Sequence, residues 1–354
     1  MSTLAASVEV VTRSGLRRIG DLYDGLHELL VPKTTPYGIS SHAMFRDVEV
    51  EYAGLRPVWR VTMHRGRQKR ELLTTADHPW MTHVRKLRPP KANGRHNGYE
   101  TVTARTTTEQ LTPGAVLRDV KASPTTRTGM VPFAVAQGFV YGDGDGDKGQ
   151  GERPATLTIY DQDKDKALLP FFAAHETKLI TANGGKEALR IYGLPRLWKA
   201  APDFRETRAF LLSWLAGYFA ADGTVTEDGS ARIGSASEDA LGLVRSVAAI
   251  CGIRYGPLRT SMRVGTGTQP TPLHTVTITA PDLPDWFFVI EEHRRRVAAR
   301  ADIREQHVRH WIVDEVQPTG QQAEVSTVHV PGVDALALSE DLMTGVLASP
   351  HPQG

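Results

Sequence analysis

The sequence predicts an α+β protein in which a β-rich domain is interrupted by an inserted α+β domain with two similar halves. Residues 1–125 and 306–346 carry short strand patterns separated by turns, whereas the residues between them mix helix and strand patterns. In this middle part, residues 136–144 and 215–223 repeat one design, a short apolar helix that ends in Asp-Gly. The 354 residues are enough for about two or three domains and a substantial core.

The two outer segments are predicted to form one split β domain. The first segment has strand patterns, with Arg65-Gly66-Arg67 as a hairpin turn, at residues 49–52, 58–63 and 71–74. The strand patterns return at residues 310–316, 323–330 and 334–338. One β domain interrupted by an insertion explains this order, and residues 347–354 remain as a tail.

The inserted domain is expected at residues 126–305, with halves at about 126–205 and 206–305. After each Asp-Gly comes a polar, glycine-rich stretch and then a strand, at residues 155–160 and 231–233. In the second half, Ser237 is a suitable N-cap for a helix over residues 240–251, and a further strand is expected at 274–279.

The paired Asp-Gly helices carry the strongest functional signal. Small residues recur at a spacing of four, Gly138 with Gly142 and Gly217 with Ala221, and such residues let two helix backbones approach closely. If the two helices pack together, their C-terminal ends place Asp143 and Asp222 side by side. One such helix alone would be ordinary, since many core helices end at a glycine. Two in one chain, with aspartates 79 residues apart (222 − 143), are much more specific.

These segments resemble the LAGLIDADG homing endonucleases. The second copy matches the nine-residue motif at Leu215, Ala216, Gly217, Ala221, Asp222 and Gly223. The first copy is looser and keeps Gly138, Asp143 and Gly144. The resemblance implies two αββαββα repeats and the hydrolysis of DNA phosphodiester bonds with a divalent metal.

The outer segments resemble the Hint domain of inteins. The resemblance is carried by Val10–Gly15, by Thr75–Trp80, and near the end by Glu324-Val325, Val330–Gly332 and Leu342–Gly345. It implies that Thr75 and His78 once assisted the first acyl shift of protein splicing. Together, the two resemblances cover nearly the whole chain.

Several departures from the intein pattern indicate that splicing has been lost. The first nucleophile falls near Ser2 or Thr3, with almost no residues before it. Val346 stands where the final asparagine belongs, and Leu347 follows in place of Cys, Ser or Thr. In addition, Asp334 stands where a histidine is expected, and Thr327 stands where an internal cysteine is expected. We therefore expect a free-standing endonuclease on a degenerate Hint scaffold, in which Thr75 and His78 are vestigial.

Asp143 and Asp222 are the expected catalytic metal ligands. The carbonyl groups of Gly142 and Ala221 are additional ligands, because the last carbonyls of a helix lack intrahelical partners. An all-oxygen site favours Mg²⁺, or Mn²⁺ in its place. The resemblance also implies basic support, for which the candidates are Lys178 and Lys186 in the first half and Arg263 in the second.

The segment that begins at Asp143 also resembles the start of an EF-hand calcium loop, with Asp145 and Asp147 in ligand positions. It departs from that motif at Lys148, where glycine is required, and at Pro154, where glutamate is required.

Double-stranded DNA is the expected partner. The strands after each Asp-Gly should present side chains to the major groove, from Arg153, Thr156, Thr158, Thr224, Thr226, Arg232, Arg259 and Arg263. A basic run without acids at residues 84–98 adds Arg85, Lys86 and Arg88 as possible phosphate contacts. Plain solvated surface is the alternative for each of these residues. Two non-identical halves imply a long, roughly asymmetric target site and a monomeric enzyme.

The composition limits which other classes of protein the chain could belong to. The net charge of +2 does not by itself indicate a nucleic-acid binder. A single cysteine, Cys251, excludes an internal disulfide. Neither a signal peptide nor an apolar run of ~20 residues is evident, so we expect a cytoplasmic protein with no membrane partner. The chain most resembles the nuclease-bearing inteins of phage and bacterial genes, and this resemblance implies a bacterial host cell.

Three alternatives to an endonuclease without splicing activity stay open. The chain could be a nuclease-dead DNA-binding protein, although both motif aspartates are intact. It could be an intein with residual or engineered-out self-splicing, although Val346 and Leu347 argue against that. The third is a structural protein with neither activity, which the paired motifs disfavour.

Overall fold

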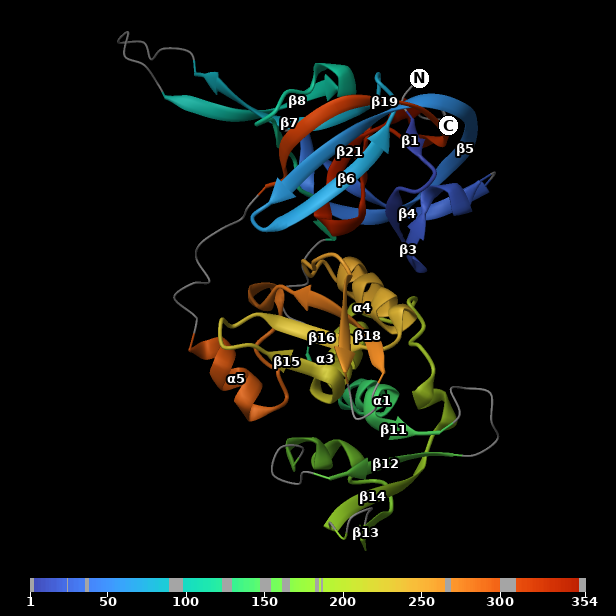
Figure 1. Cartoon of the computed structure of the whole chain (residues 1–354), viewed down its shortest axis with the longest axis vertical. Coiled ribbons are helices and arrows are strands. Elements are labelled where there is room, and N and C mark those ends of the chain that lie inside the picture. The colour runs from blue at the N-terminus through green and yellow to red at the C-terminus, as the bar shows by residue number, and fades with distance from the viewer. Residues whose placement is uncertain are drawn as a thin grey trace. The chain divides into compact units, whose positions relative to one another are not determined.

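The computed structural model describes residues 3–23, 25–35, 38–88, 98–122, 129–146, 154–160, 166–181, 185, 187–264, 269–299 and 310–349. The chain forms two compact units (Figure 1). The β unit contains Met1–Pro124 and Val308–Gly354, and the inserted unit contains Thr125–His307. No helix among the described residues is both long and apolar enough to cross a membrane.

The described residues of the β unit form one sheet of 14 strands. Its longest strands are β5 (Gly38–Arg65) and β19 (Ile312–Pro331), which pair antiparallel although the whole inserted unit separates them in sequence. The other strands are β1 (Leu4–Ala5), β2 (Glu9–Thr12), β3 (Gly15–Arg18), β4 (Gly25–Thr35), β6 (Gln68–Thr74), β7 (Pro79–Leu87), β8 (Tyr99–Thr107), β9 (Val116–Leu117), β10 (Lys121–Ala122), β20 (Ala335–Ala337), β21 (Met343–Gly345) and β22 (Leu347–Ser349).

Segments from both ends of the chain interleave in this sheet. β1 pairs with both β6 and β19, and β21 pairs with β7. Three 3-10 turns connect the strands: η1 (Ile19–Leu22), η2 (Thr108–Gln110) and η7 (Ser339–Asp341). The fully buried tryptophans Trp80 and Trp311 lie in its core. The residues before and after the insertion therefore share one hydrophobic core.

The strand predictions for this unit were right in location and wrong in number. Residues 49–52 and 58–63 belong to the single strand β5, and residues 310–316 and 323–330 belong to the single strand β19. Glycines with positive φ, Gly54 and Gly320, and shifts of pairing register let these strands bend without ending. The predicted hairpin turn at Gly66 is confirmed, with φ of 64° between β5 and β6.

The inserted unit contains two repeats with the same strand order. The first repeat has α1 (Pro132–Asp143), β11 (Gly144–Asp145), β12 (Ala155–Ile159), β13 (Thr177–Thr181) and β14 (Glu187–Leu194). The second has α3 (Arg208–Asp222), β15 (Gly223–Val225), β16 (Ala231–Ser235), α4 (Glu238–Ile250), β17 (Arg259–Val264), β18 (Pro270–Ile278) and α5 (Glu291–Ala298). The sheets run β11-β12-β14-β13 and β15-β16-β18-β17.

The repeats differ between their second and third strands. There the second repeat has α4, with Ser237 as the predicted N-cap, and its hydroxyl accepts a hydrogen bond from Ala240 N. In the described part of the first repeat, the 3-10 helix η3 (Lys166–Phe172) stands at this place and contains Pro170, which cannot donate to a helical ladder. Two further 3-10 turns, η4 (Arg196–Lys199) and η5 (Ala280–Asp282), follow the last strand of each repeat.

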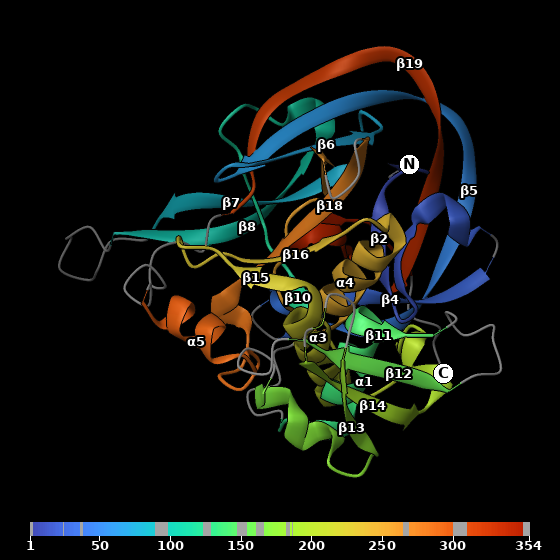
Figure 2. The same cartoon turned by 60° about the horizontal axis from the view of Figure 1, so that its bottom comes forward.

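Helices α1 and α3 lie side by side at the centre of the inserted unit, with one sheet on either side (Figures 1 and 2). A Cβ atom on Gly138 would lie 1.9 Å from Trp214 O, and one on Gly217 would lie 2.0 Å from Val135 O. Only glycine fits at either position, because any side chain would overlap a backbone carbonyl. The predicted close packing of the two motif helices is therefore present.

We expect Gly217→Ala to destabilise the inserted unit by roughly 3 kcal/mol or more, because the added methyl group must push the two helices apart. Gly242→Ala is the matched control, since that glycine is also inside a helix and a Cβ there would meet nothing within 4 Å. This control should stabilise the unit by about 0.5–1 kcal/mol. Urea unfolding followed by circular dichroism measures both changes, and equal stability of the two variants would contradict the packing argument.

Candidate functional site

Asp143 and Asp222 are the last residues of α1 and α3 and lie at the same end of the helix pair. A Cβ atom on Gly142 would lie 2.5 Å from Ala221 Cβ and 3.4 Å from Asp222 Oδ2. The carboxylate of Asp222 therefore lies against the residue that precedes Asp143. Both aspartates are exposed to solvent. The structure thus brings together the four residues of the predicted metal site.

Gly144 and Gly223 end the two helices in the same way. The N–H of each donates to the carbonyl four residues earlier, that of Val140 or Phe219. A Cβ atom on either glycine would lie within 2.5 Å of that same carbonyl oxygen. Glycine after each aspartate is therefore a requirement of the helix end, and it fixes where the carboxylate emerges.

The surroundings of Asp222 disfavour its negative charge. Although the side chain is exposed, the protein atoms around its carboxylate desolvate it, and this effect together with the charge of Asp143 raises the pKa of Asp222 to about 6. A hydrogen bond from Tyr218 and the charge of Lys199 act in the opposite direction. Two carboxylates at the negative ends of two helix dipoles form a place where a cation is strongly favoured.

The donor set fits a hard divalent cation. Among the residues that the structure describes, no three His, Cys, Asp or Glu side chains group as a ready-made metal site. The available donors are the two carboxylates and the helix-end carbonyls of Gly142 and Ala221. Mg²⁺ is bound in this manner, through one or two carboxylates with water and substrate phosphate completing the shell.

Lys199 is a site residue that sequence reasoning missed. Its side chain is 8% exposed, and Nζ donates to Val140 O at 3.1 Å and to Tyr141 O at 2.8 Å. It thereby places a positive charge at the C-terminal end of α1, beside both aspartates. The available signal was weak: a lysine that follows Trp198 near the end of the first half.

The basic residues that were predicted instead lie elsewhere. Lys178 is on β13, with Nζ 2.9 Å from Glu176 Oε1, and both side chains are more than half exposed. Arg263 is exposed on β17. Lys186 and Arg153 lie outside the described residues.

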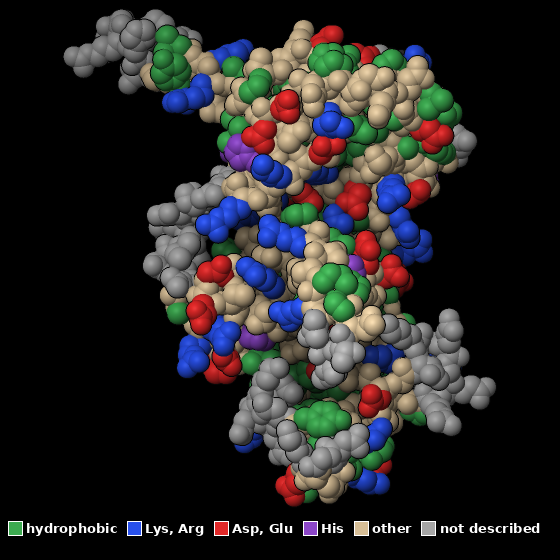
Figure 3. All heavy atoms as spheres, viewed as in Figure 1, with side chains coloured by type: hydrophobic (Ala, Val, Ile, Leu, Met, Phe, Trp, Pro, Cys, Tyr) green, Lys and Arg blue, Asp and Glu red, His purple; other side chains and the backbone are tan. Residues whose placement is uncertain are grey.

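In the second repeat, four of the predicted DNA-contacting residues share one face of the sheet. Thr224, Arg232 and Thr277 stand opposite one another on three neighbouring strands, so their side chains point to the same face. Arg259 pairs with Thr275, and Arg263 pairs with Thr271. Thr271, Thr275 and Thr277 are separated by even numbers of residues along β18, so both arginines point to the same face as Thr277. The opposite face carries the buried Val225, Ile233, Val276 and Ile278. Figure 3 shows Lys and Arg side chains gathered over these strands.

Thr226 does not belong to this face. It lies in the turn after β15, where its hydroxyl bonds the Asp228 carboxylate and donates to Ser230 O at 3.1 Å. Thr226 is therefore a turn residue, as threonines between two strands often are.

The first repeat has a similar but less basic face. Thr158, Arg190 and Lys178 stand opposite one another on β12, β14 and β13. Arg190 Nη2 donates to Thr156 Oγ1 at 3.1 Å, and the guanidinium lies 5.7 Å from the centre of the Tyr192 ring. The sequence analysis named Thr156 and Thr158 but not Arg190, which lies on a strand whose pairing is interrupted by a bulge.

The basic run of the β unit lies on the hairpin of β7 and β8, which projects from the sheet (Figure 1). Arg85, Lys86 and Arg88 are exposed there. Arg85 stacks 5.1 Å from the centre of the Tyr99 ring, and Arg88 lies 3.9 Å from Glu100. The structure therefore places these cations on the described outer part of a two-stranded arm.

Thr75 and His78 lie in the interior of the β unit, where His78 N donates to Thr75 O at 3.2 Å. Thr75 Oγ1 accepts from Thr3 Oγ1 at 3.0 Å and donates to Asp77 Oδ1 at 2.7 Å, beside a cavity of about 280 Å³. His78 is fully buried, with Nε2 2.6 Å from Thr344 Oγ1, and burial lowers its pKa to about 3. Val346 is buried as well, and its side chain has no nucleophilic group.

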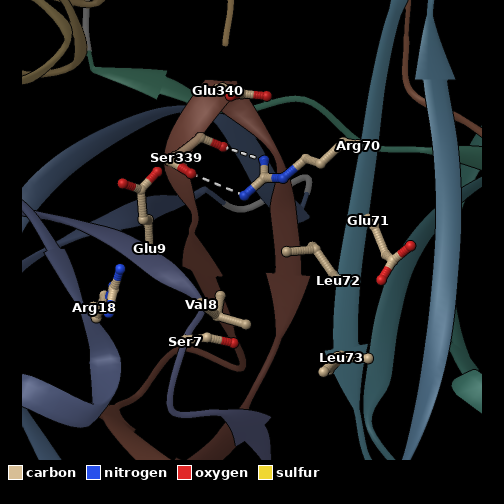
Figure 4. A pocket seen from close by; sticks show the side chains of 10 residues that line it. All are labelled: Ser7, Val8, Glu9, Arg18, Arg70, Glu71, Leu72, Leu73, Ser339 and Glu340. Carbon is tan, nitrogen blue, oxygen red and sulfur yellow. Dashed lines mark hydrogen bonds between the residues drawn. The ribbon is translucent and has the colours of Figure 1, made fainter. Parts of the chain in front are cut away.

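A second cavity of the β unit, of about 350 Å³, holds none of the predicted residues. Arg70 crosses its rim from β6 and donates to the carbonyl of Ser339 at 2.5 Å and to its hydroxyl at 2.8 Å (Figure 4). The next two residues, Glu340 and Asp341, are buried with φ near 60°. Arg70 thus holds a turn whose backbone conformation is costly for side chains other than glycine.

The burial of His78 predicts a loss of stability in acid. The unfolded pKa is near 6.5 and the folded pKa about 3, so between these values the unfolded chain binds a proton that the folded chain does not. The contribution of His78 is therefore complete above about pH 6.5 and is lost as the pH falls toward 3.

We expect the β unit to lose stability between about pH 7 and pH 4.5 more steeply in the wild type than in His78→Gln. Hydrogen exchange of β7 peptides during urea unfolding measures this difference. Parallel pH profiles of the two proteins would show that His78 is not the responsible group.

The comparisons with known proteins support part of the predicted resemblance. Residues 209–282 match the model of a LAGLIDADG-like domain. No curated protein matches the chain. Full-length DUF199/WhiA from Thermatoga maritima is similar at 14% identity and a TM-score of 0.34, over 52% of this chain and 64% of that chain.

Two other solved structures are similar to parts of the chain. Mesophilic variants of the homing endonuclease I-DmoI match at 14% identity and a TM-score of 0.29, over 50% of this chain and 96% of theirs. A mutant Ssp DnaB mini-intein matches at 15% identity and a TM-score of 0.20, over 34% of this chain and 86% of its own. The family match covers the second motif and most of its repeat, so the chain contains a LAGLIDADG-like domain at residues 209–282.

Proposed function

We propose that the protein is a divalent-metal-dependent endonuclease that cuts both strands of double-stranded DNA. The observation that carries the proposal is the pair of aspartates, Asp143 and Asp222, at the ends of two helices that only glycines allow to pack so closely. One of the two helices lies in the LAGLIDADG-like domain. A structural protein would need neither the acids nor their convergence.

Each residue group has a distinct task in the proposed reaction. Asp143 and Asp222, with the carbonyls of Gly142 and Ala221, would hold Mg²⁺ or Mn²⁺. A bound divalent ion neutralises phosphate charge and lowers the pKa of an attacking water. Lys199 keeps a fixed positive charge at the end of α1, where a negative scissile phosphate would otherwise meet the two acids and the helix dipoles. Because burial holds the ammonium against two carbonyls, it is already oriented before DNA binds.

The two sheet faces are the proposed DNA-binding surface. Arg232, Arg259 and Arg263 in one repeat, and Arg190 and Lys178 in the other, present cations and hydrogen-bond donors on exposed strands. Because these sets differ, the target should be long and roughly asymmetric. One chain supplies both acids, so we propose a monomeric enzyme. A DNA substrate in a bacterial host would place its action in the cytoplasm.

The β unit is proposed to be a Hint domain that no longer splices. Val346 has no group that could attack its own carbonyl, and Arg105 Nη2 donates to its carbonyl oxygen at 2.7 Å. Arg105 Nη1 also lies 3.1 Å from Asp334, at the position where splicing would need a histidine. Both groups are therefore engaged in structural contacts. We propose that the β7–β8 arm provides additional phosphate contacts.

The proposal is tested by incubating the full chain and Mg²⁺ with a library of phage and bacterial genomic DNA and sequencing the ends. Discrete double-strand breaks are expected. Asp222→Asn and Asp143→Asn should each abolish double-strand breaks, while Asp228→Asn, an exposed turn aspartate, serves as the charge control. Tight DNA binding without breaks would favour a nuclease-dead DNA-binding protein, and the absence of both would contradict the proposal.

The DNA-binding surfaces are tested by the salt dependence of affinity for a random-sequence duplex. Each phosphate contact that is lost should lower the slope of log K against log salt by about 0.9. We expect Arg232→Gln with Arg259→Gln to lower the slope by about 2, and Arg85→Gln, Lys86→Gln and Arg88→Gln together by up to about 3.

The matched control for both sets removes three exposed cations elsewhere on the β unit, Arg17, Arg67 and Lys69. A slope that changes as much in this control would show that only net charge matters. An unchanged slope in the arm variant alone would exclude the arm and leave the sheet faces in place.

A further inference from the structure

The contacts between the two motif helices are reciprocal. A Cβ atom on Gly138 would meet the carbonyl of Trp214, and one on Gly217 would meet the carbonyl of Val135. Both pairs of equivalent residues differ by the same offset, 217 − 138 = 79 and 214 − 135 = 79 residues. Contacts in which each partner meets the equivalent of the other are those of a two-fold axis. The two repeats are therefore related by an approximate two-fold rotation, as are the two strands of a DNA duplex.

The strand pairing identifies the equivalent residues of the two sheets. The glycine after each motif aspartate pairs with a buried residue on the second strand, which pairs in turn with a buried residue on the third. These rows are Gly144–Leu157–Ile191 in the first repeat and Gly223–Ile233–Val276 in the second. One residue before this row on each strand, Thr156 is therefore equivalent to Arg232, and Arg190 is equivalent to Thr275.

An arginine and a threonine have thus exchanged places between the repeats. In the first repeat the threonine is on the second strand, β12, and the arginine is on the third, β14. In the second repeat the arginine is on β16 and the threonine is on β18. The two positions are diagonal neighbours, since Thr158 and Gly234 are the residues directly opposite Arg190 and Thr275. A long side chain reaches across such a diagonal.

Arg190 makes this reach in the structure. Its Nη2 donates to Thr156 Oγ1 at 3.1 Å, so its guanidinium lies over the position that is equivalent to Arg232. Nη2 also lies 4.0 Å from Asp145 Oδ2, and the guanidinium carbon lies 5.7 Å from the centre of the Tyr192 ring. These contacts orient the side chain before DNA binds, which lowers the entropic cost of binding. Each repeat therefore brings one guanidinium to the same place on its sheet, from a different strand.

That place is close to the end of each motif helix. Asp145 and Thr224 lie two residues after the motif aspartates and stand directly opposite Thr156 and Arg232. DNA that spans both sheets with its scissile phosphates at the helix ends would meet these guanidiniums near the centre of the site. The approximate two-fold axis puts them at equal distances on either side of that centre.

We propose that Arg190 and Arg232 are specificity-determining residues that each read one guanine, placed symmetrically about the centre of the DNA site. The inference rests on the DNA-binding faces of the proposed function. The fork of an arginine donates two hydrogen bonds to O6 and N7 of guanine in the major groove, and this is the commonest specific contact of an arginine with DNA. The two guanines lie on opposite strands. They form a symmetric pair within a target that is asymmetric elsewhere.

The proposal is tested by selecting bound duplexes from a pool with a randomised core. The full chain is used in EDTA, so that the selection reports binding without metal-dependent cleavage. Sequences bound by the wild type should hold the two guanines. Arg190→Thr should lower the preference for one guanine about 10-fold and leave the other unchanged, and Arg232→Thr should do the reverse. Arg67→Thr, which removes an exposed cation of the β unit, is the matched control and should keep both preferences.

An exchange variant tests whether the two arginines are equivalent. Thr156→Arg combined with Arg190→Thr installs in the first repeat the arrangement of the second. It should recover the guanine preference that is lost in Arg190→Thr alone. A preference that stays lost in the exchange variant would refute the equivalence of the two guanidiniums. Thermal transitions that match the wild type show that the changes in preference do not come from unfolding.

The outcomes separate this inference from the proposed function. A uniform fall in affinity for all sequences in Arg190→Thr, with a lower salt slope and unchanged base preference, would identify a phosphate contact and overturn the inference. Binding by the wild type without the guanine pair would also defeat this inference alone. A wild type that selects both guanines but cuts no DNA would defeat only the nuclease. A wild type that binds no duplex would defeat the proposed function itself.

Discussion

The contact between the backbones of α1 and α3 is the constraint on which the inserted unit depends. Gly138 and Gly217 bring each helix to within van der Waals distance of the carbonyls of the other. Such an approach excludes side chains from the crossing point, so all packing must come from residues beside it. Because both helices end at the same level, the distance between the two acids follows from the crossing and needs no loop to define it. A site built on rigid helices is more exact than one built on loops.

The electrostatics of this arrangement are costly without a ligand. Two carboxylates and two helix C-termini gather negative charge in one place, and the raised pKa of Asp222 reflects this crowding together with desolvation. Lys199 offsets part of that cost by a charge-assisted hydrogen bond to the end of α1. The protein thus supplies one cation of its own and leaves a position in which another cation is favoured.

How much of this could be predicted from the sequence differs from element to element. The motif helices, their glycines and both aspartates could be predicted, because the glycines and the aspartate of each helix lie within one motif of nine residues. Lys199 and Arg190 were missed because their roles come from tertiary contacts with α1 and with β12, which no local pattern records. The lengths of β5 and β19 were underestimated for a related reason, since their pairing spans the whole insertion. Thr226 was taken as a strand residue, although a threonine followed by Asp228 and Gly229 is equally typical of a turn.

The pairing of β5 with β19 also determines the order in which the molecule can fold. The β unit lacks one of its longest strands until residues beyond Ile312 are synthesised, whereas the inserted unit is complete by then. Near the places where the chain leaves and re-enters the β unit, His310 Nδ1 and Asp119 Oδ2 are hydrogen-bonded at 2.8 Å. An unfolded insertion would make that closure entropically expensive, but a folded one acts as a much shorter loop. Formation of the inserted unit during synthesis therefore removes a large part of the entropic barrier to closing the β sheet.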